Sequence, residues 1–244
     1  MDQEELTADA SGHAPGPWWR RRTALVTVVV VVLLAGLGLG LGLSLGSGSG
    51  APAGPEGVAV QKAPDLASAD STAPGTPVDG ITCRTTAQQK VAYHIHVLLQ
   101  IFVDGKQVRI PAGAGIAAPR FPEHLANGLF VDNSVNGCLY WLHVHAHDGI
   151  VHVESPYKGV FTLGEFFDIW QQPLGIDQVG PAKGTVVAWE NGRRFHGNPR
   201  DMVLTPHGEI QLDVGTPVVA YQPANFNVTG LCGAGTSGCA TKGG

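Results

Sequence analysis

Residues 91–103, VAYHIHVLLQIFV, carry an apolar side chain at every second position, and this alternation predicts a β-strand. Successive side chains of a strand point to opposite faces, so the apolar row lies on one face, which we expect to be the core side. The row consists of Val91, Tyr93, Ile95, Val97, Leu99, Ile101 and Val103. His94 and His96 then lie together on the other face. Asp104-Gly105 predicts a hairpin turn after this strand, because both residues tolerate positive φ.

A second hairpin is predicted where the sequence reads WLHVHAHDGIVHVE. A two-residue turn at Asp148-Gly149 would place His145 opposite His152 and His143 opposite Glu154. Directly opposed side chains lie roughly 5 Å apart, and neighbours on one face lie roughly 7 Å apart. These three histidines and Glu154 would therefore form one patch.

The length of this turn decides the pairing. In the two-residue turn, Val144 belongs to the opposite, core-facing side. A four-residue turn over residues 146–149 is the alternative. It would keep His143 and His145 on one face but move His152 off their level.

Histidines that converge in this way are typical of a metal site, because neutral imidazole is the commonest nitrogen ligand of zinc and copper. The candidate ligands are His94, His96, His143, His145 and His152. Glu154 is a candidate general base, or a residue that orients a ligand. His196 and His207 lie near predicted loops and are not expected to be ligands.

An all-nitrogen donor set favours Cu(II) or Zn(II) over Cu(I), and the chain contains only two methionines, Met1 and Met202. The sequence therefore predicts a protein that handles such a metal or uses it in a reaction. The alternative is a non-enzymatic binding or structural module on the cell surface, in which the histidines are incidental. The sequence contains no Ser-His-Asp signature, HExxH motif or phosphate-binding loop.

The rest of the predicted domain supplies scaffold. FTLGEFFDIW predicts a helix, in which Thr162 and Glu165 form a capping box and the apolar residues are core. TVVAWENGRRF predicts a hairpin that turns at Asn191-Gly192, and EIQLDV predicts a final strand. The expected fold is α+β, with a mostly antiparallel sheet built from hairpins and one main helix; a β-grasp-like arrangement is one possibility.

Residues 23–45 are uncharged and almost wholly apolar, long enough to cross a bilayer as a helix. Arg20, Arg21 and Arg22 precede this segment, which predicts a cytoplasmic tail over residues 1–22 and an extracytoplasmic location for the rest of the chain. A cleaved signal peptide is the alternative. The alternating glycines from Gly36 to Gly42 allow a homodimer through the anchor.

The segments after the anchor differ in composition. Residues 46–80 are rich in Gly, Ser, Ala and Pro and predict a flexible linker. The globular domain is expected over residues 81–231, with a Gly-rich tail over residues 232–244. From residue 81 onwards, 11 Lys and Arg residues face 12 Asp and Glu residues, so no nucleic-acid partner is expected.

Four cysteines on the predicted extracytoplasmic side suggest disulfides. Three pairings are possible. Cys232 with Cys239 would close a small loop, which makes Cys83 with Cys138 the preferred second pair. A soft-metal thiolate site is the rival interpretation.

The runs HIHVLLQIFVDGKQVRIPAG, CLYWLHVHAHDGIVHVESP, FTLGEFFDIW, NPRDMVLTPHGEIQLDVG and FNVTGL resemble a family of uncharacterised bacterial proteins anchored or exported by an N-terminal apolar segment. The resemblance covers about residues 79–231. It implies the domain limits and an extracytoplasmic location, and it brings no established activity. Leu98 and Ala146 depart from the pattern of the family, whereas the five candidate histidine ligands match it.

Overall fold

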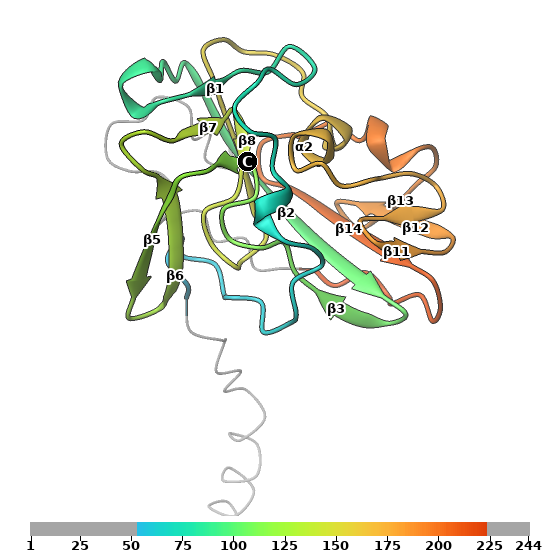
Figure 1. Ribbon diagram of the computed structural model, residues 1–244. Helices are drawn as coiled ribbons and strands as arrows, with labels where there is room; N and C mark the ends of the chain where they lie inside the picture. Colours follow the sequence, from blue (N-terminus) through green and yellow to red (C-terminus); the bar gives the residue numbers. More distant parts are fainter. Residues whose placement is uncertain (1–52, 224–244) are drawn as a thin grey trace, which may run out of the picture. The chain divides into compact units, whose positions relative to one another are not determined.

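The computed structural model describes residues 53–223, which belong to the second of two compact units, Ala51–Gly244. A seven-stranded sheet forms the centre of this unit, with the strand order β13-β12-β14-β2-β9-β8 and with β3 paired to β2. Its strands are β2 (Tyr93–Val103), β3 (Lys106–Val108), β8 (Leu142–His143), β9 (Ile150–Ser155), β12 (Val186–Glu190), β13 (Arg193–Phe195) and β14 (Gly208–Val214). Neighbouring strands are antiparallel except β14 and β2, which are parallel and lie side by side in Figure 1. The expected α+β class and the mostly antiparallel sheet are confirmed.

Smaller elements surround this sheet. The remaining strands are β1 (Cys83–Arg84), β4 (Ile116–Ala117), β5 (Arg120–Leu125), β6 (Gly128–Asn133), β7 (Cys138–Tyr140), β10 (Gln178–Val179) and β11 (Ala182–Lys183). The helices are α2 (Leu163–Ile169) and the short 3₁₀ helices η1 (Ala69–Ser71), η2 (Thr86–Gln88) and η3 (Pro199–Asp201). β1, β7 and β4 form a three-stranded sheet, and β5 and β6 form a separate hairpin.

Two predicted hairpin turns are confirmed. Val103 pairs with Lys106 around Asp104-Gly105, where φ is 48° and 75°. Glu190 pairs with Arg193 around Asn191-Gly192, where φ is 49° and 79°. Positive φ at both central residues is the geometry that matches the right-handed twist of the flanking strands.

The core lies on the predicted face of β2. Ile95, Val97, Leu99 and Ile101 are at most 3% exposed and pack in the main hydrophobic cluster with the apolar side chains of α2. Val91 is an exception, because it precedes the strand and is 45% exposed. The capping box at the start of α2 is confirmed: the Glu165 amide donates to Thr162 Oγ1, and the Thr162 amide donates to Glu165 Oε2.

The predicted two-residue turn at Asp148-Gly149 is wrong. His143 pairs with His152 instead of Glu154, and a six-residue connection joins β8 to β9. The physical reason is that this connection finds backbone partners elsewhere. The Val144 amide donates to the Ala114 carbonyl, and Ala146 forms an isolated bridge with Phe130.

The predicted flexible linker is wrong for residues 53–80, which pack on the domain. Glu56, Val58 and Gln61 are at most 8% exposed. The side-chain amide of Gln61 donates to the Asp148 carbonyl, and the backbone amide of Gln61 donates to the His147 carbonyl. These backbone acceptors order a segment that lacks hydrophobic periodicity of its own.

The disulfide between Cys83 and Cys138 is confirmed, with a Cα–Cα distance of 5.4 Å. Cys232 and Cys239 lie outside the described residues. So do the predicted membrane span over residues 23–45, its glycines and the predicted tail. Between residues 53 and 223, no helix is both long enough and apolar enough to span a bilayer.

Candidate metal centre

The non-core face of the sheet carries two adjacent rows of polar side chains. In one row His94 on β2 lies opposite Glu154 on β9. In the next row His152 on β9 lies between His96 on β2 and His143 on β8. Because opposed residues of a sheet point to the same face, the pairing alone brings these five side chains together.

His145 reaches the same point from the connection after β8. Its backbone carbonyl accepts from the Val131 amide on β6, and its Nδ1 lies 2.7 Å from the Val131 carbonyl oxygen. The Phe130 ring stacks on the imidazole at a centroid distance of 4.6 Å. The β5–β6 hairpin therefore fixes the orientation of His145.

The tautomers of His143 and His145 follow from their partners. Nδ1 of His143 lies 2.7 Å from the Tyr140 carbonyl oxygen, and Nδ1 of His145 faces the Val131 carbonyl in the same way. A carbonyl oxygen only accepts, so each Nδ1 carries the proton and each Nε2 of the neutral ring carries a lone pair. The two Nε2 atoms face each other at 3.0 Å.

Both rings are neutral at physiological pH. Burial, together with the neighbouring His152, lowers the pKa of His143 and of His145 to about 4. Two lone pairs in contact repel each other unless a cation lies between them. The distance of 3.0 Å between the two Nε2 atoms is close to the distance between two ligand nitrogens of a tetrahedral zinc site. That distance is roughly 3.3 Å for Zn–N bonds of about 2.0–2.1 Å.

His152 is held between two carboxylates. Its Nε2 donates to Glu56 Oε1 at 2.6 Å, and its Nδ1 lies 3.7 Å from Glu154 Oε1. Burial alone would lower the pKa of His152, but these carboxylates raise it to about 10. Burial alone would raise the pKa of each glutamate, whereas His152 and its neighbours hold both values below the ordinary range. A carboxylate on the outer nitrogen of a histidine is typical of metal ligands, because it fixes the ring and increases its basicity.

His96 is the least satisfied side chain of the group. It is 1% exposed, and within residues 53–223 neither ring nitrogen has a hydrogen-bond partner. Burial, together with His152 and His94, lowers its pKa to about 2, so the ring is neutral. Burying a polar group without a partner costs folding free energy, so a ring nitrogen of His96 is available to bind a ligand.

The polar side chains form two overlapping donor sets in which the ligand atoms all lie within 4.8 Å of one another. The sets are His143, His145, His152 and Glu154, and His94, His96 and His152. All five histidines that the sequence predicts as ligands are therefore brought together, although His152 faces His143 instead of His145.

No protein-family model, curated protein or solved structure matches this chain.

Sequence reasoning missed Glu56, Val131 and Asp148. Glu56 is the only charged residue between Arg22 and Lys62, which was a signal in a segment that otherwise lacks charge. Asp148 is fully buried, and its Oδ1 accepts from the Ile150 amide across the turn. Burial and the nearby Glu56 raise the pKa of Asp148 well above its ordinary value.

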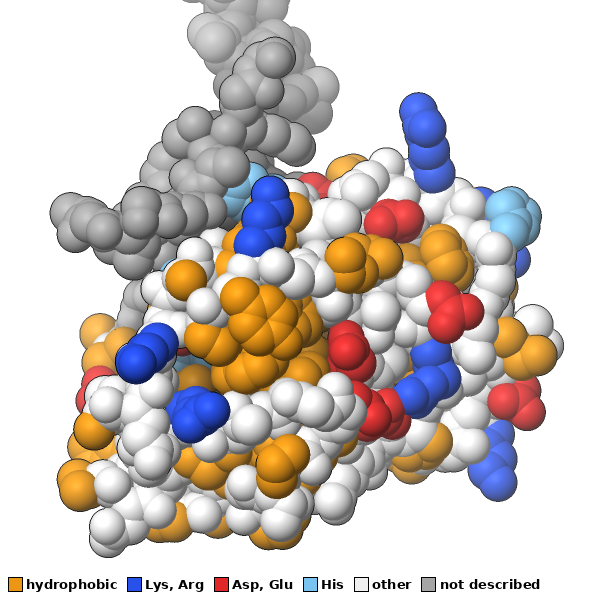
Figure 2. All heavy atoms as spheres, turned by 90° about the horizontal axis from the view of Figure 1, so that it is seen from above, with side chains coloured by type: hydrophobic (Ala, Val, Ile, Leu, Met, Phe, Trp, Pro, Cys, Tyr) orange, Lys and Arg blue, Asp and Glu red, His pale blue; other side chains and the backbone are white. Residues whose placement is uncertain are grey.

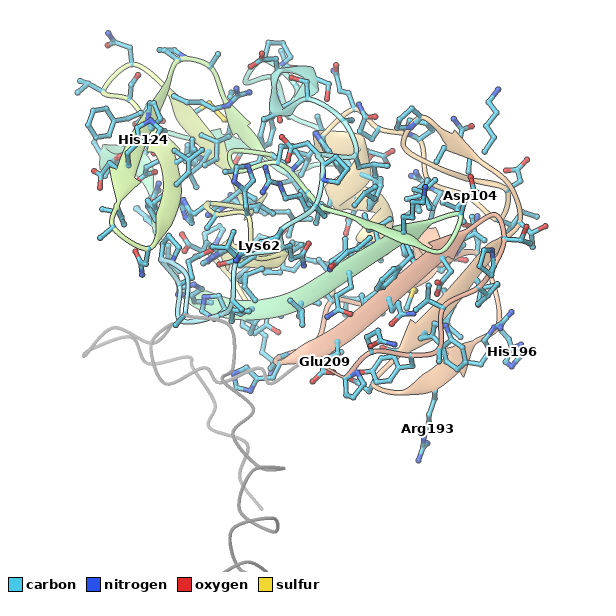
Figure 3. The ribbon with its side chains drawn as sticks, turned by 90° about the horizontal axis from the view of Figure 1, so that it is seen from below. Lys62, Asp104, His124, Arg193, His196 and Glu209 are labelled. Carbon is cyan, nitrogen blue, oxygen red and sulfur yellow. A yellow bond between two sulfur atoms is a disulfide. The ribbon has the colours of Figure 1, made fainter. Side chains whose placement is uncertain are left out.

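The other described histidines lie outside both donor sets. His124 and His196 are exposed and lie far apart at the surface (Figure 3). His147 is half-buried, with Nε2 3.7 Å from Asp65 Oδ1. The His207 amide donates to the His96 carbonyl.

Proposed function

We propose that this chain binds one Zn(II) or Cu(II) ion through His143, His145, His152 and Glu154. The contact that carries the proposal is the one between the Nε2 atoms of His143 and His145, 3.0 Å apart, in rings whose Nδ1–H groups donate to backbone carbonyls. A cation between these lone pairs converts a repulsive contact into two coordinate bonds.

The donor atoms narrow the choice of metal. Three imidazoles and one carboxylate suit Zn(II) and Cu(II), whereas Cu(I) prefers sulfur ligands. Cys83 and Cys138 are joined in a disulfide, and Met202 is buried in the hydrophobic core, so none of these residues competes as a soft ligand.

The number of ions follows from His152, which both donor sets share. Its Nε2 is engaged by Glu56, so Nδ1 is the nitrogen that remains for a metal. One nitrogen lone pair serves one ion, which supports a single ion per chain. His94 and His96 then lie beside the bound ion.

Glu154 is better suited to bind the ion than to act as a general base. The surrounding histidines hold the pKa of its carboxyl well below the usual range, against the effect of burial. A general base is most effective when its pKa is close to the working pH, so this carboxylate is a weak base. Its permanent negative charge instead compensates the charge of the metal.

Titration of the chelator-treated protein with Zn(II) or Cu(II) tests the proposal. We expect one equivalent to bind and about one proton to be released at pH 7, because His152 is the ligand that starts out protonated. Metal analysis gives the stoichiometry, and calorimetry in buffers of different ionisation enthalpy gives the proton count. Failure to bind either ion would refute the proposal.

We also place the centre outside the cytoplasm, on a single-pass anchor over residues 23–45 that provides a route to homodimers. The arginines before this segment and the extracytoplasmic resemblance support that orientation. A reporter enzyme that works only outside the cytoplasm, fused after Gly244, is expected to be active. An active cytoplasmic reporter at the same position would reverse the orientation.

A further inference from the structure

A pocket of about 170 Å³ lies beside Glu154, outside the proposed ligand sphere. Its lining includes Arg84, Gln89, Lys90, Leu139, Trp141 and Glu154. The volume is enough for a small organic molecule, since a cavity for a single water needs only about 10–15 Å³.

Two of the lining residues are cationic. Arg84 and Lys90 are exposed, and neither forms an ion pair with another residue of the described chain. By contrast, Arg109, Arg120 and Arg200 are paired with aspartates. The Arg84 Nε donates to Thr82 Oγ1 at 2.9 Å, which orients the guanidinium without neutralising it. A guanidinium and an ammonium in the lining of one pocket are complementary to a carboxylate.

Other lining residues are apolar. Trp141 and Leu139 are 7% and 4% exposed, and the Trp141 ring stands nearly perpendicular to the rings of Tyr157 and Phe161, at centroid distances of 5.4 and 6.2 Å. These contacts hold the indole in place as a flat wall. In Figure 2, which looks down on the end of the molecule where Figure 1 shows β1, hydrophobic side chains gather with Lys and Arg side chains beside them.

The pocket borders the metal centre directly. Trp141 and Glu154 are neighbours across β8 and β9, where the Glu154 amide donates to the Trp141 carbonyl at 2.7 Å. On its other side, Glu154 Oε1 lies 3.2 Å from His94 Nε2. His94 and Glu154 are 15% and 16% exposed, more than the buried histidines behind them. A molecule in the pocket therefore lies against the most open side of the centre.

We infer that this pocket binds a small organic carboxylate with an aromatic or otherwise apolar body, next to the metal ion. The carboxylate pairs with Arg84 and Lys90, and the apolar body lies on Trp141. This inference names the ligand class of the proposed metal centre and rests on that proposal for its role, whereas the binding itself depends on the pocket residues.

Benzoate is a suitable probe, with benzamide as its neutral counterpart. Calorimetry should show that benzoate binds at least tenfold more tightly than benzamide. The double variant Arg84→Ala/Lys90→Ala should weaken benzoate binding at least tenfold. The matched control Lys62→Ala/Arg193→Ala removes two cations elsewhere on the surface (Figure 3) and should change it less than twofold.

Running the same titrations on metal-loaded and chelator-treated protein separates this inference from the proposed function. Charge-dependent benzoate binding in the chelator-treated protein supports the pocket even if no metal binds. Equal affinity for benzamide, or undiminished benzoate binding in Arg84→Ala/Lys90→Ala, overturns it. Benzoate binding that requires the metal ion and does not depend on Arg84 and Lys90 also overturns it, since the carboxylate would then be coordinating the metal ion.

Discussion

The double variant His143→Ala/His145→Ala is expected to lose tight Zn(II) or Cu(II) binding, with the dissociation constant rising at least about 100-fold. Loss of a residue that merely orients a ligand weakens metal binding about 10–100-fold, so loss of two ligands should exceed that range. Both rings are neutral in the metal-free protein, so their removal leaves no buried charge without a partner. Competition with a chelator of known affinity measures the change.

Two controls accompany this variant. His124→Ala/His196→Ala removes two exposed histidines and should change the dissociation constant less than about twofold. Val144→Ala truncates a fully buried side chain of the main core, which should lower the free energy of unfolding by about 2 kcal/mol without changing metal affinity. Unchanged metal affinity in the His143→Ala/His145→Ala protein would leave the histidines as an incidental cluster.

The stability of the metal-free protein should be greatest near pH 6.5 and should fall on both sides. Below this pH the unfolded chain protonates His143 and His145 at their ordinary pKa, whereas in the folded state their pKa is about 4. Stability is therefore lost as pH falls from 6.5 to 4, by at most about 3 kcal/mol for each residue. His152 acts in the opposite sense. Its folded pKa of about 10 contributes stability that is complete below 6.5 and lost as pH rises towards 10.

Urea denaturation at a series of pH values measures this profile, with the chelator present throughout. The variant His143→Gln should show a shallower decline between pH 6.5 and 4, and His124→Gln should follow the wild-type curve. A free energy of unfolding that stays constant from pH 7 to pH 4.5 would show that the buried imidazoles do not resist protonation.

Local patterns were enough to predict much of the fold. Alternation placed His94 and His96 on the face opposite the core, and the capping box at Thr162 located the start of α2. The turns at Asp104-Gly105 and Asn191-Gly192 were predictable because two adjacent residues determine their geometry. Each of these features depends on residues that are close in the sequence.

The features that were missed depend on contacts between distant residues. The β8–β9 register follows from backbone partners such as Ala114 and Val131, which no local rule connects to the turn. Glu56 joins the centre from a segment whose composition predicts disorder, and its hydrogen bond to His152 spans 96 positions. The parallel pairing of β14 with β2 is likewise absent from the pattern of either strand.

The segment that carries Glu56 and Gln61 makes metal affinity and local folding two parts of one equilibrium. Glu56 engages His152, and Gln61 fastens the same segment to the Asp148 and Leu99 carbonyls. If Glu56 strengthens the hold of His152 on the ion by some factor, the bound ion must strengthen the attachment of the segment by that same factor, since linked equilibria are reciprocal. A shortened protein that begins at Ile81 would lack both halves of this coupling. Its metal affinity would be that of the histidine cluster without Glu56 and Gln61. The loss of metal affinity relative to the full chain would measure what the segment contributes.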